Sequence, residues 1–258
     1  MKSSNPFFNN KTFSPTSRVY GAQEDVNVIT HNETMTVKGT INKSMFLFAI
    51  LVTSALLSGY LMLFEGVHPY ALLLGGGITG FVIALIATFK PNYSGVLAPA
   101  YSLFEGLFIG GISIILELRY PGVALKAAGG TLVTFMVCFL LYRFGIVKVT
   151  EQFRSVVMAS VLAIGTYYLL SWIVSFFTGS YFVGHSFEDS SLMSIGISVF
   201  IIVVASLNLF LNFDMIEQGA QRRLPKHMEW YSAMGLMIAV VWLYLEFLKL
   251  FAKISGRD

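Results

Sequence analysis

The sequence of 258 residues has little charge and a single cysteine, and each scarcity excludes a kind of protein. Charged residues make up 12% of the chain against 55% hydrophobic residues, a balance too apolar for a soluble domain of this length. Cys138 cannot form an intramolecular disulfide, and we expect a buried, inert thiol in its apolar run. The net charge of +3 comes from basic residues at the ends of apolar runs rather than from one patch, so we expect no nucleic-acid partner.

Histidine is also scarce and lies outside the apolar runs. The four histidines are His31, His68, His185 and His227. No imidazole cluster with the spacing of a metal site can therefore form inside a membrane, and we expect no zinc centre and no other cofactor.

Long apolar runs fill most of the chain. Their lengths are mostly near the roughly 20 residues that a helix needs to cross hydrocarbon, and they lack the alternation of a membrane β-barrel. The sequence thus predicts an all-α, seven-transmembrane-helix protein in contact with a lipid bilayer. The runs are 45–64, 70–89, 95–116, 127–142, 155–177, 190–213 and 233–251.

The ends of the chain differ from this apolar region. Residues 1–43 are polar and contain no apolar stretch of signal-peptide length, so they predict a flexible tail. Within it, 35–43 is more regular, and we interpret it as a surface loop, with packing against the bundle as the alternative. The predicted organisation is a tail over 1–43, a membrane domain over 44–253 and a short tail over 254–258.

The basic residues between the runs predict an orientation, because cytoplasmic loops are enriched in lysine and arginine. The opposite connections contain only Arg119 and Lys126. We therefore expect a cytoplasmic N-terminus, an external C-terminus and, for a bacterial protein, a location in the inner membrane. The basic residues of the cytoplasmic set are Lys38, Lys43, Lys90, Arg143, Lys148, Arg154, Arg222, Arg223 and Lys226.

Glycines are frequent in the second, third and fourth runs. Gly76 with Gly80 and Gly106 with Gly110 have the G-x-x-x-G spacing, which lets helix backbones approach closely in lipid. We interpret these glycines as packing residues rather than ligand sites.

Acidic residues inside a bilayer are costly, so they usually face a bundle interior or a water-filled path. Glu105 lies in the middle of the third run, and Asp214 follows the uncharged sixth run. Glu246 and Lys249 are three positions apart in the seventh run, on one helix face, where they can form an ion pair. The alternative is that Lys249 reaches outward while Glu246 faces the interior. Glu229, near a run end, is interpreted as a solvated flank.

Four segments, in this order, carry a family resemblance. The chain resembles the transmembrane Bax inhibitor motif family, in its bacterial branch, over roughly 43–253. The segments are YSLFEGLFIGGISIIL (101–116), KAAGGTLVTF (126–135), NLFLNFDMIEQG (208–219) and WLYLEFLKLF (242–251).

The resemblance implies six helices around a central seventh and a pH-sensitive calcium leak through the bundle. It also implies a proton-sharing acid pair, for which the matching positions are Asp214 and Glu246. Glutamate replaces the family's usual aspartate at 246, and the two acids lie 32 positions apart in the sequence. That separation predicts about 13 Å of mismatch in depth unless tilt absorbs it. Glu229 is the rival partner for Asp214.

Ionising both carboxyl groups of a pair in a poorly hydrated site is costly in free energy, so the two groups would share one proton that holds them together. Loss of that proton would favour the binding of a divalent cation. Calcium prefers several oxygen ligands. Asp214 and Glu246 would bind it transiently, with Glu105, Asn208 and Asn212 as further lining residues.

Two other functions stay open on the sequence. One is a proton-coupled secondary transporter, although we see no clear inverted repeat. The other is a non-transporting regulator that docks on a membrane-protein partner, such as a protease, through its polar tail. We expect no enzyme, because neither acid has a Gly-x-Gly-Asp context and no histidine lies in a run to act as a base.

Overall fold

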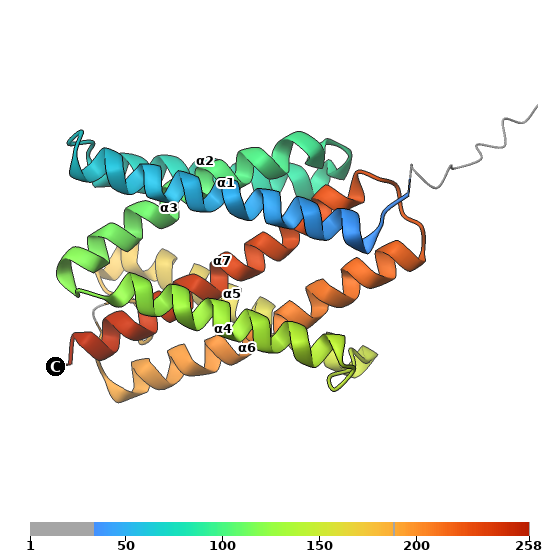
Figure 1. The fold of residues 1–258 in the computed structure, drawn as a ribbon. Helices are drawn as coiled ribbons and strands as arrows, with labels where there is room; N and C mark the ends of the chain where they lie inside the picture. Colours follow the sequence, from blue (N-terminus) through green and yellow to red (C-terminus); the bar gives the residue numbers. More distant parts are fainter. Residues whose placement is uncertain (1–33, 188, 258) are drawn as a thin grey trace, which may run out of the picture. The chain divides into compact units, whose positions relative to one another are not determined.

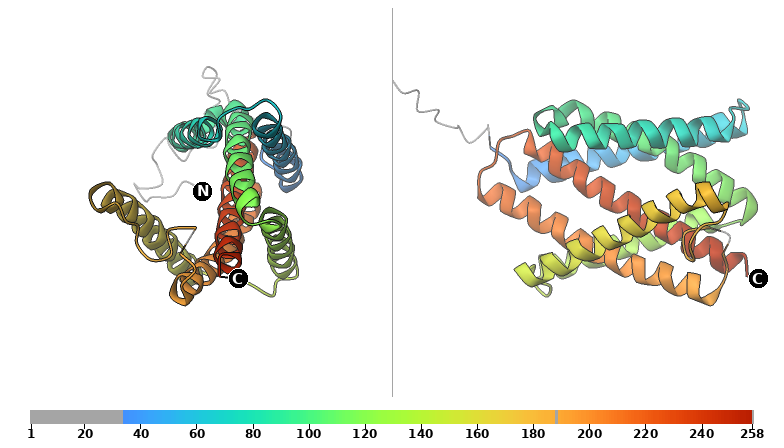
Figure 2. Two further views of the ribbon diagram at one scale, coloured as in Figure 1. Left: turned by 90° about the vertical axis from the view of Figure 1, so that its left-hand side faces the viewer. Right: turned by 180° about the vertical axis from the view of Figure 1, so that it is seen from behind.

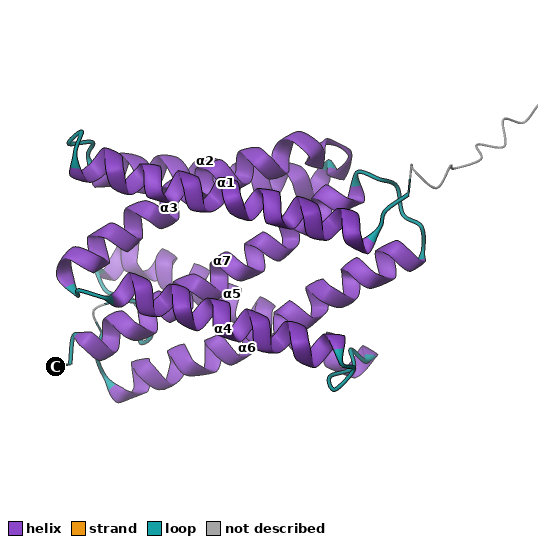
Figure 3. Ribbon diagram, viewed as in Figure 1, coloured by secondary structure: helices purple, strands orange, loops and turns teal. Residues whose placement is uncertain are grey.

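The computed structural model describes residues 34–187 and 189–257, and this part of the chain is built from helices (Figure 1). The described residues contain no strand (Figure 3), and among them only Thr34 and Pro225 form an isolated antiparallel bridge. The helices are α1 (Val37–Leu63), α2 (Pro69–Phe89), the 3-10 turn η4 (Pro91–Tyr93), α3 (Ser94–Arg119), α4 (Val123–Arg143), α5 (Glu151–Thr178), α6 (Leu192–Gln221) and α7 (Met228–Ser255).

Seven helices of the described residues are long and apolar enough to cross a bilayer, one for each predicted run. The all-α, seven-helix prediction is therefore confirmed. Polar residues begin several of these helices, because a side-chain oxygen can accept a hydrogen bond from an unpaired amide of the first turn. Thr36 caps α1, Thr150 caps α5 and Ser191 caps α6 in this way.

The first helix begins earlier than the sequence predicts. It starts at Val37, so most of the segment 35–43 is helical and its interpretation as a surface loop is wrong. Met35 is buried, and its amide donates to the Leu224 carbonyl oxygen at 2.7 Å. A polar helical turn is stable here because these contacts and the Thr36 cap hold it. The predicted flexible tail falls mostly on residues 1–33, which lie outside the described residues.

Helix α7 is packed against α1, α3, α4 and α6, whereas α2 packs mainly on α3 and α5 mainly on α6. In the end-on view α4 and α5 lie on opposite sides of α7 (Figure 2). The buried aliphatic core includes Leu47 of α1, Leu209 of α6 and Leu243 of α7. A seventh helix enclosed by all six others remains a prediction.

The predicted glycine pairs lie where helices approach closely. A Cβ atom added at Gly76 of α2 would lie 2.6 Å from the Phe104 carbonyl oxygen of α3. On the other side of α3, added Cβ atoms at Gly106 and Gly110 would overlap carbonyl oxygens of α1. These positions therefore set the α1–α3 and α2–α3 separations.

Candidate functional site

The acidic and basic side chains of α7 lie at two levels along this helix. We call the end of the bundle where α1 begins its amino-terminal end, and the end where α7 finishes its carboxy-terminal end. Glu229 lies in the first turn of α7 at the amino-terminal end, and Glu246, Lys249 and Lys253 lie in its last three turns.

Glu246 is a buried carboxylate held by three different donors. Its side chain is 1% exposed and accepts hydrogen bonds from the Tyr168 hydroxyl (3.0 and 3.2 Å), the Trp242 indole (3.3 Å) and the Lys249 ammonium (3.0 Å). Trp242 and Lys249 reach it from one turn away on α7, on the same helix face. Of the two alternatives open for this pair, the structure contains the Glu246–Lys249 ion pair, and Lys249 does not turn outward.

Tyr168 joins α5 to this pair. Its hydroxyl donates to Glu246 and accepts from Lys249 at 2.8 Å, and the same ammonium lies 4.1 Å from the centre of the Tyr168 ring. The buried positive charge is therefore compensated by a carboxylate, a phenol oxygen and an aromatic face together. We define the Glu246 cluster as Glu246, Lys249, Tyr168 and Trp242.

Lys253 lies one turn beyond Lys249 and is fully buried. Its ammonium donates to the Gly184 carbonyl at 2.9 Å, to the Ser198 hydroxyl at 2.8 Å and more weakly to the Ser194 carbonyl at 3.4 Å. Its partners come from the α5–α6 connection and from α6, so this lysine ties both to the end of α7.

His185, in the α5–α6 connection, covers the Glu246 cluster. Its ring stacks on Tyr181 at 4.7 Å and meets the Tyr168 ring edge-on at 5.2 Å. Among the described residues no group hydrogen-bonds to its Nδ1. Burial lowers the pKa of His185, as do Lys249 and Lys253, while Glu246 acts in the opposite direction. The imidazole is therefore neutral at pH 7.

This lowered pKa predicts a loss of stability in acid. Below its ordinary pKa of about 6.5 the histidine of the unfolded chain takes up a proton before that of the folded chain, so stability falls as the pH falls. His185→Gln cannot take up this proton and is expected to lose less stability between about pH 7.5 and pH 5.5. Thermal unfolding in detergent measures the effect, and the exposed His68→Gln is the control. Equal acid losses in His185→Gln and the unsubstituted protein would contradict the assignment.

Asp214 lies in α6 near the amino-terminal end, with a side chain 15% exposed. It accepts hydrogen bonds from the Arg154 guanidinium and from the Gln218 amide, both at 2.7 Å. Arg154 comes from the first turn of α5, so this ion pair links α5 to α6.

Glu229 is 1% exposed and is not a solvated flank. It accepts hydrogen bonds from the Thr36 amide and hydroxyl, both at 2.9 Å, and it pairs with Lys226 at 2.9 Å and with Lys43. The flank interpretation is wrong because four donors from two segments compensate this charge. Among the described residues Glu229 also forms no contact with Asp214 that would make it the rival partner.

The structure does not bring Asp214 and Glu246 together. A Cβ atom added at Gly235 of α7 would lie 3.3 Å from the Asn212 side-chain oxygen of α6, which fixes the level at which these two antiparallel helices meet. Glu246 lies eleven positions from Gly235 toward the carboxy-terminal end, and Asp214 lies two positions from Asn212 toward the amino-terminal end. At about 1.5 Å per residue their levels differ by about 20 Å. The predicted direct contact is therefore absent, because the short α6–α7 connection leaves the two acids far apart along the bundle.

The other predicted lining residues are also separate from the two acids. Glu105 is partly buried in α3 beside Gly80 of α2, and no described residue forms an ion pair or hydrogen bond with its carboxyl group. The Asn212 side chain donates to the Asn208 carbonyl within α6 at 2.9 Å. No cluster of three or more histidine, cysteine, aspartate or glutamate side chains in the described part of the chain could hold a metal ion.

Sequence reasoning missed Tyr168, Lys253 and the pairing role of Arg154. A tyrosine in an apolar run has no distinctive signal, and the charge pattern indicates only a marker of orientation at Arg154. Lys253 had one usable signal, because it follows Lys249 by one helical turn and therefore lies on the same face of α7.

The fold and these buried ion pairs define an integral, multi-pass membrane protein with charged groups inside a seven-helix bundle. Comparison with curated proteins and with solved structures finds no match. A family model described as "Bax inhibitor 1 like" matches residues 5–256. The chain belongs to this Bax inhibitor-like family, which confirms the resemblance drawn from the sequence.

Proposed function

We propose that this protein is a proton-responsive cation leak, with calcium as the transported ion and with Asp214 and Glu246 as its proton-sensing groups. The role is non-enzymatic. The observation that carries the proposal is Glu246, a carboxylate buried about two and a half turns before the end of a membrane-spanning helix. Ionisable groups in such positions mark ion or proton pathways, and the family resemblance implies a calcium leak.

In this proposal each acid senses protons through its own ion pair with a basic side chain, and the two acids do not share one proton. Each carboxylate is neutralised by its own partner, Asp214 by Arg154 and Glu246 by Lys249. Protonation in acid removes the negative charge and leaves the cation without its partner, which is costly for a buried pair. A fall in pH therefore loosens α5 from α6 at Asp214 and destabilises the Glu246 cluster between α5 and α7.

Calcium needs several oxygen ligands at about 2.3–2.6 Å. Asp214 and Glu246 would each offer a carboxylate to calcium only in the ionised form and only once the partner cation has moved away, and Glu105, Asn208 and Asn212 would supply further oxygens at other levels. Single oxygen ligands at separate levels along the bundle favour the conduction of calcium over its tight binding, because conduction needs several weak sites.

The orientation is part of the proposal. We place the amino-terminal end of the bundle in the cytoplasm and the protein in a bacterial inner membrane, because most basic residues of the connections lie at that end. Arg154 and Asp214 would then respond to cytoplasmic pH, and the Glu246 cluster would lie closer to the external side.

The test is calcium uptake into proteoliposomes measured across a range of pH. Asp214→Asn is expected to flatten the pH dependence, because an amide neither titrates nor pairs with Arg154. Glu65→Gln, an exposed acid in the α1–α2 connection, is the matched control and should keep the pH profile of the unsubstituted protein. Uptake no faster than in protein-free liposomes at every pH would overturn the leak, and an unchanged profile in Asp214→Asn would remove this residue as a sensor.

A further inference from the structure

A groove of about 830 Å³ separates α1 from α4 in the amino-terminal half of the bundle. Helices α6 and α7 form its floor through residues such as Phe213 and Met237, and α1 and α4 form its walls. The two wall helices lie in front of α7 in the view of Figure 1.

The groove is apolar throughout its interior. Its two buried hydroxyl side chains are Ser44 of α1 and Thr131 of α4. Each donates to a carbonyl of its own helix, at 2.9 Å and 2.8 Å, so neither hydroxyl proton is left for an occupant. The interior therefore fits a hydrocarbon chain rather than a polar solute.

The dimensions of the groove match one leaflet of a bilayer. Along α1 its lining runs from Val37 to Phe48, which is about 17 Å at the rise of an α-helix. That length is about half of a hydrocarbon core roughly 30 Å thick. Met45 and Leu132 on the two walls are 67% and 55% exposed, so the groove opens sideways from the bundle, where lipid tails lie.

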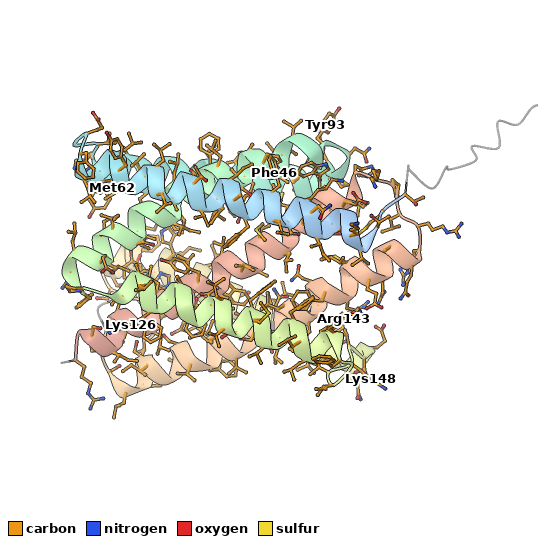
Figure 4. All side chains as sticks on the ribbon, in the orientation of Figure 1. Phe46, Met62, Tyr93, Lys126, Arg143 and Lys148 are labelled. Atoms are coloured by element: carbon orange, nitrogen blue, oxygen red, sulfur yellow. The ribbon has the colours of Figure 1, made fainter. Side chains whose placement is uncertain are left out.

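The mouth of the groove is basic. Arg143 lies at the end of α4 (Figure 4) and Lys38 lies on α1, and both are exposed. Neither forms an ion pair with any described residue. The one acid among the lining residues, Glu217, accepts a hydrogen bond from the Tyr142 hydroxyl at 2.6 Å. Two cations against one acid leave this mouth with a net positive charge. A basic site between membrane helices at the level of the headgroups suits an anionic lipid phosphate.

We propose that this groove binds an anionic phospholipid of the leaflet at the amino-terminal end. One acyl chain lies between α1 and α4 on the floor of α6 and α7, and the phosphate lies between Lys38 and Arg143. The apolar interior accepts any acyl chain, so the two basic residues determine the selectivity for headgroup charge.

The test is native mass spectrometry of the purified full-length chain in a mild detergent. The protein is titrated with phosphatidylglycerol or with phosphatidylcholine of the same acyl chains. We expect tighter retention of phosphatidylglycerol, and a loss of about fivefold in its affinity for each of Lys38→Gln and Arg143→Gln. Lys148→Gln, an exposed basic residue outside the groove lining, is the matched control and should retain phosphatidylglycerol fully.

A second variant tests the acyl-chain part of the groove. Leu132→Trp fills the groove from the α4 wall and should weaken the binding of both lipids alike while the helical circular dichroism is unchanged. Equal retention of the two lipids by the unsubstituted protein would overturn the proposal, as would equal losses in Lys148→Gln and Lys38→Gln. Occupation by a second copy of the chain, seen as a dimer without lipid, would overturn it as well.

Discussion

Replacement of Glu246 by glutamine is expected to destabilise the folded protein by about 3–5 kcal/mol, since it removes one partner of a buried ion pair. The Lys249 ammonium would keep the Tyr168 hydroxyl and ring but lose its only carboxylate among the described residues. Thermal unfolding in detergent measures this loss. The double variant Glu246→Gln/Lys249→Met removes both charges and is expected to recover most of the stability, because replacing a whole buried pair by neutral groups is often close to neutral.

The same double variant separates stability from proton sensing. In the proteoliposome assay we expect it to show calcium uptake with a flattened pH dependence, since it contains neither the carboxylate nor the ammonium of the pair. A full pH response in this stable double variant would exclude Glu246 as a sensor. If the variant Glu246→Gln alone were as stable as the unsubstituted protein, the Glu246–Lys249 pair would contribute little to the stability of the folded protein.

Alanine at Gly110 is expected to destabilise the protein by about 1–3 kcal/mol or more, because the added methyl group overpacks a close helix contact. Its Cβ would overlap the Ala55 carbonyl oxygen of α1, a backbone atom that cannot rotate away. Moving α1 outward would also stretch the hydrogen bonds from Ser54 and Ser58 to the carbonyl groups of Leu103 and Leu107, now 2.6 and 2.9 Å.

Gly129→Ala is the matched control for Gly110→Ala. Gly129 lies in the interior of α4, and an added Cβ there would have no atom within 4 Å. Alanine is the better helix former by about 0.5–1 kcal/mol, so this variant should be slightly more stable than the unsubstituted protein. Equal changes in the two variants would show that helix propensity, and not the α1–α3 contact, determines the effect at Gly110.

The sequence was sufficient to predict the seven spans, since each needs only a long apolar run, and the G-x-x-x-G contacts, since their spacing is local. The Glu246–Lys249 pair can be predicted for the same reason, because the two residues are three positions apart on one helix. Contacts between segments that are distant in the sequence cannot be predicted in this way. The Arg154 partner of Asp214 is 60 positions away and the Tyr168 partner of Glu246 is 78 positions away.

The distance of each acid from the α6–α7 connection explains why Asp214 and Glu246 form no contact. Two antiparallel helices joined by a short connection place side by side only residues at similar distances from that connection. Asp214 is close to the α6–α7 connection and Glu246 is far from it, so helix tilt would have had to absorb the difference. Glu229 shows the opposite case: its position in the first turn of α7 suggested contact with solvent, whereas the residues before α1 bury it.

The attachment of the start of α1 to Glu229 and Leu224 has a consequence for biosynthesis. Residues near the beginning of the chain need partners that the ribosome adds almost 200 positions later. The first span must therefore enter the lipid with its leading turn unsupported and wait until the last span has been inserted. A nascent chain that stalls before residue 229 should leave this turn accessible to proteases, and completion of synthesis should protect it.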